Sequence, residues 1–402
     1  MIAKILLPAL AAIGTVSAQS QTCTVSTTTI QNQADATALA SCRTVRGSVV
    51  IAPNSGASID ISGPSQITGD LEIADNGQIT QFRGDDLTII GGAFTMRNVT
   101  QLAQLTLPSL TKVKSLNWRT LNALDTLTIG PPGLTEAEEV TISDTFLSSL
   151  DGIDLSSVKK MDINNNRRLT EFTTQLGNLS DFLNIQANGL QLKVSMPNLK
   201  WIANMTIANV TSFSVPSLAV VNGSARFDSN YFSTFSAPNL TATRSGDISF
   251  VGNGNLKNIS LPVLTTVGGG LLIANNTGLE AIDGFPSLKT VGGAVKLRGS
   301  FDEAAFPALN DVKGAFDASS TQDITNSCNE LKKKASGRDG GSGQIQGTFS
   351  CTSNNAKAND DTGSGTSAGG SGGSKKDAAS GVSLNSALLG LAAVAGLAQA
   401  FL

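Results

Sequence analysis

The chain repeats a short phrase in which apolar and polar residues alternate over four or five positions. Examples are DLEIADN, AFTMRN, KMDINNN, FLNIQAN, ARFDSN, DISFVGN and LLIANN. Alternation with a period of two is typical of a half-buried β-strand, because successive side chains point to opposite faces of the strand. Residues 49–319 contain no convincing run of about ten residues with helical spacing of apolar positions. The pattern therefore predicts many short strands and almost no helix.

Two markers recur along these phrases with one common period. An asparagine near the end of the strand returns every 21 to 24 residues, with Asp144 replacing it once and Ser300 as its last clear substitute. A proline returns in phrases such as LTLPSL, VSMPNL, FSVPSL, FSAPNL and ISLPVL. A unit of this length cannot bury its apolar side alone and has to stack on copies of itself.

The sequence therefore predicts an all-β fold, a parallel β-helix of about twelve to thirteen coils over residues 49–320. A horseshoe of helical leucine-rich repeats is the less favoured alternative, because helical spacing is missing. In a parallel stack the same position of every coil forms one file, so we expect strand-end asparagines to hydrogen-bond to the next coil. The expected members of this asparagine ladder are Asn54, Asn76, Asn166, Asn188, Asn230, Asn253 and Asn276.

The two open ends of such a stack need covers, since each exposes unpaired backbone groups and apolar side chains. The only plausible short helices are ADATALASC, residues 34–42, and NSCNELKKKA, residues 326–335. We therefore expect an N-terminal cap at residues 19–48 and a C-terminal cap at residues 321–352.

The four cysteines lie in or beside these caps. In a secreted chain they imply two disulfides, for which three connectivities are possible. Pairing of neighbours is favoured, because each bond then ties down one cap. The expected disulfide cysteines are Cys23, Cys42, Cys328 and Cys351.

Both ends of the chain carry expected targeting signals. Lys4 precedes an apolar run and small residues that suit signal peptidase, so residues 1–18 are expected to form a signal peptide. A Gly/Ser-rich linker at residues 353–374 leads to residues 375–402, an expected propeptide for a glycosylphosphatidylinositol (GPI) anchor with an apolar tail. Attachment of the GPI anchor at Gly372 or at Asp377 fits the motif, and the sequence does not distinguish between these two sites.

Composition removes several kinds of chemistry. The chain has no histidine, which excludes Ser-His and Cys-His nucleophile pairs and histidine-ligated metals. Cysteines committed to disulfides leave no thiol nucleophile. A net charge of −3 without a basic run argues against nucleic acid as a partner. We therefore expect no catalytic residues, no metal site, no cofactor and no enzymatic activity.

One enzymatic alternative remains, a pair of carboxylates such as glycoside hydrolysis requires. Carbohydrate sites usually offer aromatic platforms, and aromatic residues make up only 5% of the chain. Trp201 is predicted to lie in the core, and Trp118 either in the core or at an exposed contact. Arg83 to Asp85 spell an RGD tripeptide, which is interpreted as a polar turn. The candidate carboxylates are Glu136, Glu138, Glu139, Asp144, Asp151, Asp154, Asp85 and Asp86.

Glycosylation gives the strongest site-level signal. Eight N-x-[ST] sequons lie between the expected caps. Two of their asparagines, at positions 98 and 209, follow the apolar strand residue by two positions where most coils have three, so we predict that they point outward and carry glycan. The eight expected sites are Asn98, Asn178, Asn204, Asn209, Asn222, Asn239, Asn258 and Asn275.

A secretory signal, cysteine-flanked coils of the form φ-x-φ-P-x-L-x-x-V-x-G, where φ is apolar, a Gly/Ser spacer and an anchor tail together resemble fungal GPI-anchored cell-wall organisation proteins. That family is related to the receptor L-domain superfamily, itself similar to leucine-rich repeats. The resemblance covers essentially the whole chain. It implies an L-domain-like solenoid at the plasma membrane or in the wall, heavy glycosylation, a part in wall integrity and no assigned catalytic residue. The Gly-rich stalk departs from the serine-rich stalks that such proteins often carry, so it does not support heavy O-glycosylation there.

Three hypotheses follow. The first is a non-enzymatic, glycan-coated surface protein that helps to order the wall, with glucan, mannan and wall proteins as possible partners and the plasma membrane as its anchor. The second is a binding module that recognises a glycan or a protein on its flat parallel sheet. The third is a wall-remodelling glycosidase or transglycosidase. Sequons on every face favour the first, and one face without sequons favours the second.

Overall fold

The structure is a computed structural model that describes residues 23–337 and 340–360. The expected signal peptide and anchor segment, with the attachment candidates Gly372 and Asp377, lie outside the described residues.

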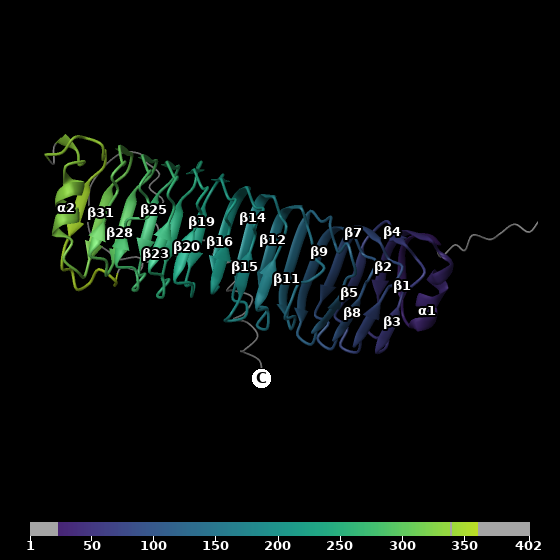
Figure 1. Cartoon of the computed structure of the whole chain (residues 1–402). Coiled ribbons are helices and arrows are strands. Elements are labelled where there is room, and N and C mark those ends of the chain that lie inside the picture. Colours follow the sequence, from purple (N-terminus) through teal and green to yellow (C-terminus); the bar gives the residue numbers. More distant parts are fainter. Residues whose placement is uncertain (1–22, 338–339, 361–402) are drawn as a thin grey trace, which may run out of the picture. The chain divides into compact units, whose positions relative to one another are not determined.

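The described residues stack as coils, and each coil contributes to one large parallel sheet of 21 strands (Figure 1). Each strand pairs with the corresponding strand of the coil before it and of the coil after it, as Ala225 does with Met205 and with Ile248. The strands are β1 (Thr24–Ile30), β2 (Thr44–Ile51), β4 (Gln66–Ile67), β5 (Leu71–Ala74), β7 (Ile89–Arg97), β9 (Lys112–Leu121), β11 (Glu139–Thr145), β12 (Ser157–Asn164), β14 (Asn178–Gln186), β16 (Trp201–Ala208), β18 (Val220–Val221), β19 (Ala225–Asp228), β21 (Ala242–Thr243), β22 (Ile248–Val251), β24 (Thr266–Val267), β25 (Leu271–Ala274), β27 (Thr290–Val291), β28 (Val295–Gly299), β30 (Asp311–Val312), β31 (Phe316–Ser320) and β32 (Phe349–Thr352).

The predicted all-β parallel solenoid is confirmed, with about 14 turns. The sequence estimate was slightly lower because it counted only residues 49–320. Strands β1 and β32 lie in the expected cap segments and still pair with β2 and β31.

A second side of the coils carries shorter strands, which pair in parallel in four separate groups. They are β3 (Ser58–Asp60), β6 (Gln81–Arg83), β8 (Gln104–Thr106) and β10 (Thr126–Thr128); β13 (Glu171–Thr173), β15 (Lys193–Ser195) and β17 (Ser212–Ser214); β20 (Thr234–Ser236) and β23 (Asn258–Ser260); β26 (Ala281–Ile282) and β29 (Glu303–Ala304).

The core is built from files of apolar side chains, because parallel register places the same strand position of every coil in one line. Burying each large side chain of such a file stabilises the fold by about 1.5–3 kcal/mol. Phe227 and Phe250 stack within their file, with ring centroids 4.7 Å apart. One fully buried file contains Ile73, Met96, Trp118, Ile142, Ile163, Ile185, Ile207, Phe227, Phe250, Ile273, Leu297 and Ala318.

The recurring proline sits at the second position of a four-residue turn. In the turn that begins at Leu107, the N–H of Leu110 donates to the carbonyl of Leu107 at 3.2 Å, and the turn from Leu261 to Leu264 has the same distance. Proline suits this position because its fixed φ matches the turn. The leucine that closes each turn is buried, so the proline phrase both bends the chain and returns an apolar side chain to the core.

Helices close both ends of the stack. Helix α1 (Gln33–Ala38) continues into the 3-10 turn η2 (Leu39–Ser41), and α2 (Thr325–Lys332) lies at the other end. Disulfides join Cys23 to Cys42 and Cys328 to Cys351, which is the pairing of neighbours.

The caps also satisfy backbone groups at the ends of the short sheets. The side-chain amide of Gln33 donates to the carbonyl of Asp60 at 3.0 Å and accepts from its N–H at 2.8 Å, as a neighbouring strand would. At the other end Ser327 accepts from the N–H of Ala304 at 3.0 Å. Among the described residues no helix is both long and apolar enough to cross a membrane.

Candidate functional site

Buried asparagines from successive coils form a hydrogen-bonded file, in two runs, at the end of the large sheet. The side-chain oxygen of Asn253 accepts from the backbone and side-chain N–H groups of Asn230 at 2.9 and 3.0 Å. Asn276 accepts from Asn253 in the same way, both at 2.9 Å. Each side-chain nitrogen also donates to a carbonyl of the preceding coil, as Asn253 does to Phe227 at 2.9 Å. These bonds replace the hydration that burial removes.

A second run of this file joins Asn166 to Asn188, with the side-chain bond at 3.0 Å. Val210 separates the two runs, although its backbone N–H still donates to Asn230 at 3.1 Å. At the N-terminal end Asn76 donates to Ser55 at 2.9 Å.

The structure does not bring Asn54 into the file. Asn54 is exposed, and the buried Ser55 takes the place expected for it. The N–H of Ser55 closes a turn onto the carbonyl of Ala52 at 3.2 Å, with Pro53 inside the turn. This turn moves the inward position one residue further along the chain.

Sequence reasoning missed a second file, directly before the asparagines, in which the backbone is left-handed. Asn98, with φ of 53°, and Asn209, with φ of 60°, belong to it rather than to the buried file. Asn98 is exposed and Asn209 is half-buried. The available signal was the residue type at most positions, since Asn, Asp and Gly tolerate this geometry best. The file contains Asp75, Asn98, Thr120, Asp144, Asn165, Ala187, Asn209, Ser229, Gly252 and Asn275.

The sequon asparagines lie at several different positions around the coil. Three belong to the left-handed file, at positions 98, 209 and 275. Three lie in or beside the first half of the large-sheet strands, at positions 178, 204 and 222, while Asn239 lies in a proline turn and Asn258 begins β23. Six of the eight are exposed, and Asn209 and Asn275 are half-buried.

The outward side of the large sheet contains a strip whose central file has no sequon asparagine, which we call the bare strip. Several of its small polar residues are almost covered, with exposed fractions of 6% for Thr141, 7% for Asn184 and 8% for Ser249. Asp162 accepts from Asn184 at 2.8 Å and from Asn164 at 2.7 Å, so the strip carries a preorganised polar network. Its central file contains Glu72, Thr95, Asn117, Thr141, Asp162, Asn184, Thr206, Arg226, Ser249, Leu272 and Lys296.

The two tryptophans differ in burial, and the prediction for Trp201 was wrong. Trp118 is fully buried and packs edge-on against Phe94, with ring centroids 5.6 Å apart. Trp201 is half-buried at the start of β16, because the next residue, Ile202, occupies the inward position in register with Leu179. Strand alternation then turns the indole outward.

Trp201 lines a shallow hollow of about 350 Å³ on the outer surface. The same hollow is lined by Asn178 and Ser180 from β14, and by Lys159 and Glu138 from the two coils before it. Lys159 and Glu138 form an ion pair at 2.7 Å. A hydrogen bond from Lys159 and its positive charge hold the pKa of Glu138 below its ordinary value.

The pKa values of Glu138 and Asp228 are shifted in opposite directions. A general acid for glycoside hydrolysis needs a raised pKa, whereas that of Glu138 is lowered. Burial raises the pKa of Asp228, with a smaller opposing effect of Arg226. However, the register neighbours of Asp228 are Ala208 and Val251, which supply no second carboxylate.

Other candidate carboxylates are engaged or dispersed. Glu136 pairs with Lys112 at 2.6 Å, and Glu139 begins β11 at an exposed position. Asp144 belongs to the left-handed file, while Asp151 is exposed in a turn. Asp154 follows that turn and is also exposed. In the described part of the chain, no group of three or more His, Cys, Asp or Glu residues is placed to hold a metal ion.

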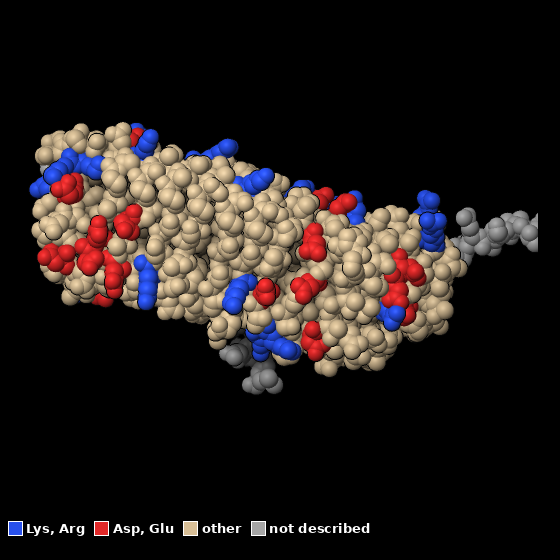
Figure 2. All heavy atoms as spheres, viewed as in Figure 1, with Lys and Arg blue, Asp and Glu red and all other residues tan. Residues whose placement is uncertain are grey.

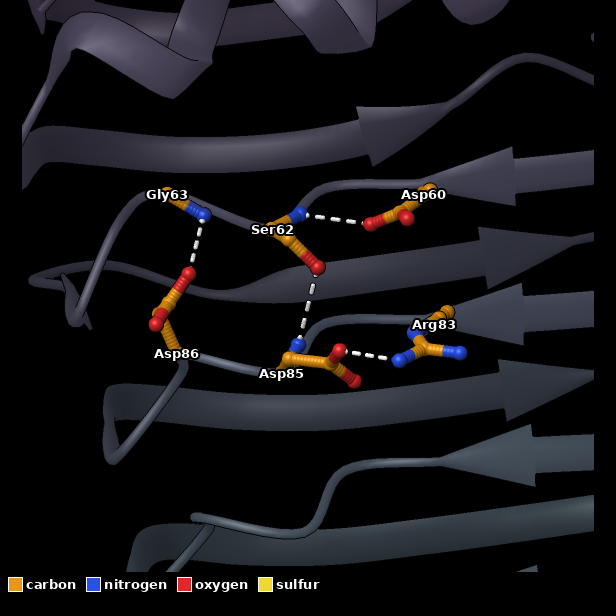
Figure 3. Close-up of polar contacts among 6 residues, drawn as sticks. All are labelled: Asp60, Ser62, Gly63, Arg83, Asp85 and Asp86. Carbon is orange, nitrogen blue, oxygen red and sulfur yellow. Dashed lines mark hydrogen bonds and ion pairs between the residues drawn. The ribbon is translucent and has the colours of Figure 1, made fainter.

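The RGD tripeptide is folded into the stack (Figure 3). Arg83 forms an ion pair with Asp85, two residues away, so the two charges face each other. The backbone N–H of Asp85 donates to Ser62 at 3.0 Å, and Asp86 accepts from the N–H of Gly63 at 2.9 Å. These bonds hold the segment as a polar turn between coils.

Charge is spread thinly over the face shown in Figure 2. Figure 2 shows side chains of both signs with wide uncharged areas between them and no continuous basic patch on the face in view. This face does not offer the electrostatic footprint of a nucleic-acid-binding surface.

Comparison with known proteins gives a consistent family. A family model described as "GPI-anchored cell wall organization protein" (Ecm33) matches residues 1–40. Protein ecm33 of Aspergillus fumigatus is 39% identical and aligns with 87% of this chain and 85% of its own length. A cell surface GPI-anchored protein of Arthroderma benhamiae is 39% identical over 73% of this chain and 75% of its own.

A cell wall mannoprotein of Saccharomyces cerevisiae, PST1, is 31% identical over 75% of this chain and 66% of its own length. No solved structure matches. Because two relatives at 39% identity align over most of both chains, this protein belongs to the family of GPI-anchored cell wall organization proteins.

Proposed function

We propose that this protein is a non-enzymatic, GPI-anchored surface glycoprotein that contributes to the organisation and integrity of the fungal cell wall. The observation that carries the proposal is family membership along almost the whole chain, at 39% identity over 87% of its residues. Membership also supports a location at the cell surface and in the wall.

A role without catalysis is supported by the arrangement of the acidic residues. The carboxyl group with a raised pKa, Asp228, has alanine and valine beside it in register. The carboxylate in the hollow, Glu138, is neutralised by Lys159. Neither arrangement combines an acid with a nucleophile or base across a sugar ring.

A glycoprotein is supported by the exposure of the sequons. Asparagines at exposed positions of a surface protein are accessible to the glycosylation machinery. We propose that the eight sequons carry glycan, including Asn98 and Asn209 in the left-handed file. Glycans at several positions around the coil would hold neighbouring wall polymers away from most of the stack. A GPI lipid at Gly372 or Asp377 would tether it to the plasma membrane.

The bare strip supports a second candidate function, recognition of a wall glycan or wall protein. Partly exposed polar groups such as Thr95 and Asn117 are fixed in a flat array by the register of the strands. No sequon asparagine lies in the central file of this strip, so the glycans attach beside it, with Asn204 two residues before Thr206 on β16. Glucan and mannan are the proposed partners, since the strip offers hydroxyl and amide groups for polar contacts.

Removal of residues 375–402 tests the proposed tethering role in fungal cells that lack the endogenous protein. The deletion variant should fold and be secreted but fail to restore resistance to wall-perturbing dyes. A matched variant that replaces the tail with an unrelated membrane span should restore it. Full rescue by the released variant would show a diffusible activity and contradict the proposal.

The bare strip is tested by Thr95→Arg on β7, in the anchored protein, against Thr234→Arg on β20 as the control, because neither threonine belongs to a sequon. Loss of wall resistance only with Thr95→Arg, at equal surface level and thermal stability, would support recognition on the strip. Equal rescue by both variants would reject that second function.

A further inference from the structure

The hollow beside Trp201 places an unusual set of groups together. The indole of Trp201 offers a flat apolar face. The chain has only two tryptophans, and the other one, Trp118, is fully buried. Asn178 and Ser180, the first and third residues of the sequon Asn178-Leu179-Ser180, line the same hollow. The site therefore combines an aromatic face with a glycosylation sequon.

Strand register fixes how close these groups are. Asn178 and Trp201 are direct partners in the pairing of β14 with β16, so their backbones lie one strand spacing apart, about 4.8 Å. Both side chains point outward from the sheet, since the following residues, Leu179 and Ile202, are buried. Asn178 is exposed, and its side-chain amide makes no hydrogen bond within the described part of the chain.

We propose that the hollow is occupied by the first sugars of an N-linked glycan carried by Asn178, with the proximal N-acetylglucosamine packed on the indole of Trp201. This inference rests on the proposed glycoprotein function. In the modification, Nδ2 of Asn178 loses a proton and bonds to the anomeric carbon of the sugar. The sugar's bond to a lipid-linked pyrophosphate breaks, and the pyrophosphate leaves as the anion.

The chemistry of the hollow suits this occupant. The C–H face and acetyl group of N-acetylglucosamine are apolar and can cover the indole, which removes apolar surface from water. The Lys159–Glu138 ion pair on the opposite side provides a donor and an acceptor for sugar hydroxyls and the acetamide. A platform of one indole is too small to hold a free polysaccharide tightly.

A covalent tether changes that balance. A ligand attached one strand away has an effective concentration on the order of millimolar or higher, so even weak stacking keeps it in place. The attached glycan therefore competes successfully with free wall polymers for the hollow. In this arrangement the glycan at Asn178 forms part of the protein surface, while glycans at sites without an aromatic neighbour extend into solvent.

The test uses the full chain expressed in a yeast secretory host, with occupancy of Asn178 measured by glycopeptide mass spectrometry. Ser180→Ala removes the sequon and keeps Asn178, while Ser180→Thr preserves the sequon and is the matched control. Acrylamide quenching of tryptophan fluorescence reports on Trp201, because the fully buried Trp118 is shielded from the quencher. Circular dichroism and emission from Trp118 show whether each variant is folded.

We expect Ser180→Ala to raise the quenching constant about twofold, since loss of the sugar uncovers the solvent-facing part of the half-buried indole. Ser180→Thr should match the wild type. In the reciprocal variant, Trp201→Val, endoglycosidase should release the Asn178 glycan faster than in the wild type, with release at Asn258 unchanged.

If Asn178 carries glycan in the wild type and Ser180→Ala nevertheless shows the same quenching constant as the wild type, the proposal is overturned. An unmodified Asn178 would overturn it as well; glycan at the other sequons would then leave the glycoprotein function standing. A change in Trp201 emission on adding β-glucan oligosaccharides to the glycosylated protein would also overturn it, because the hollow would be open to free ligands.

Discussion

Replacing Asn253 by alanine tests whether the buried asparagine file holds the stack together. The change removes the acceptor for the backbone and side-chain N–H groups of Asn230 and the donor to the carbonyl of Phe227. A buried polar group without a partner costs about 1–3 kcal/mol. Three unpartnered groups together would cost more than this, but water entering the vacated space can pair with some of them. We therefore expect the free energy of unfolding to fall by about 3 kcal/mol.

Asn255→Ala is the matched control, because Asn255 is exposed two residues away and makes only a long bond of 3.4 Å to Tyr231. It should change stability by less than about 0.5 kcal/mol. For a protein of this size, about 3 kcal/mol corresponds to a fall of about 4 °C in the thermal midpoint.

Hydrogen exchange locates the effect, because coils of a solenoid interact mainly with their neighbours. Exchange should accelerate in β19, β22 and β25 of Asn253→Ala and stay unchanged in β2 and β5. If Asn253→Ala and Asn255→Ala gave the same midpoint and exchange pattern, the claim that the file stabilises the stack would be wrong.

Three further predictions concern packing, charge and the caps. Gly292→Ala should lower the free energy of unfolding by about 3 kcal/mol in denaturant titrations, because the added Cβ would lie 2.1 Å from the carbonyl oxygen of Gly268. In the control Gly77→Ala the added Cβ meets nothing within 4 Å, so stability should not change. Burial raises the pKa of Asp228, so the wild type gains stability as pH falls and loses it as pH rises through the folded-state pKa. Asp228→Asn should therefore have a higher thermal midpoint than the wild type at pH 7, and this difference should disappear at a pH below the ordinary pKa of aspartate. The same difference in midpoint at pH 7 and at that low pH would contradict this. Cys328→Ser combined with Cys351→Ser should lower the free energy of unfolding by about 3 kcal/mol and accelerate hydrogen exchange in β31 and β32 but not in β1. A uniform loss of protection along the stack would show that the disulfide does not stabilise the C-terminal end alone.

The period and type of the coil were predictable because they depend on local alternation and on residues that suit turns. Which of two neighbouring residues in a coil points inward was harder to predict. In the segment beginning with Trp201 and Ile202, two adjacent residues are apolar, and only pairing of Ile202 with Leu179 decides which one turns inward. At Pro53, one extra turn residue moved the buried position from Asn54 to Ser55.

Features that depend on distant register were not visible in the sequence. The bare strip becomes apparent only when residues about 22 positions apart are placed side by side. The hollow at Trp201 joins four coils, and its relation to Asn178 follows from strand pairing rather than from any local motif.

The cap contacts of Gln33 and Ser327 have a consequence for crowding at the cell surface. By completing the hydrogen bonds of β3 and β29, these side chains occupy edges onto which another copy would otherwise add a strand. At a crowded cell surface, neighbouring copies are therefore less able to add a strand end to end at β3 or at β29.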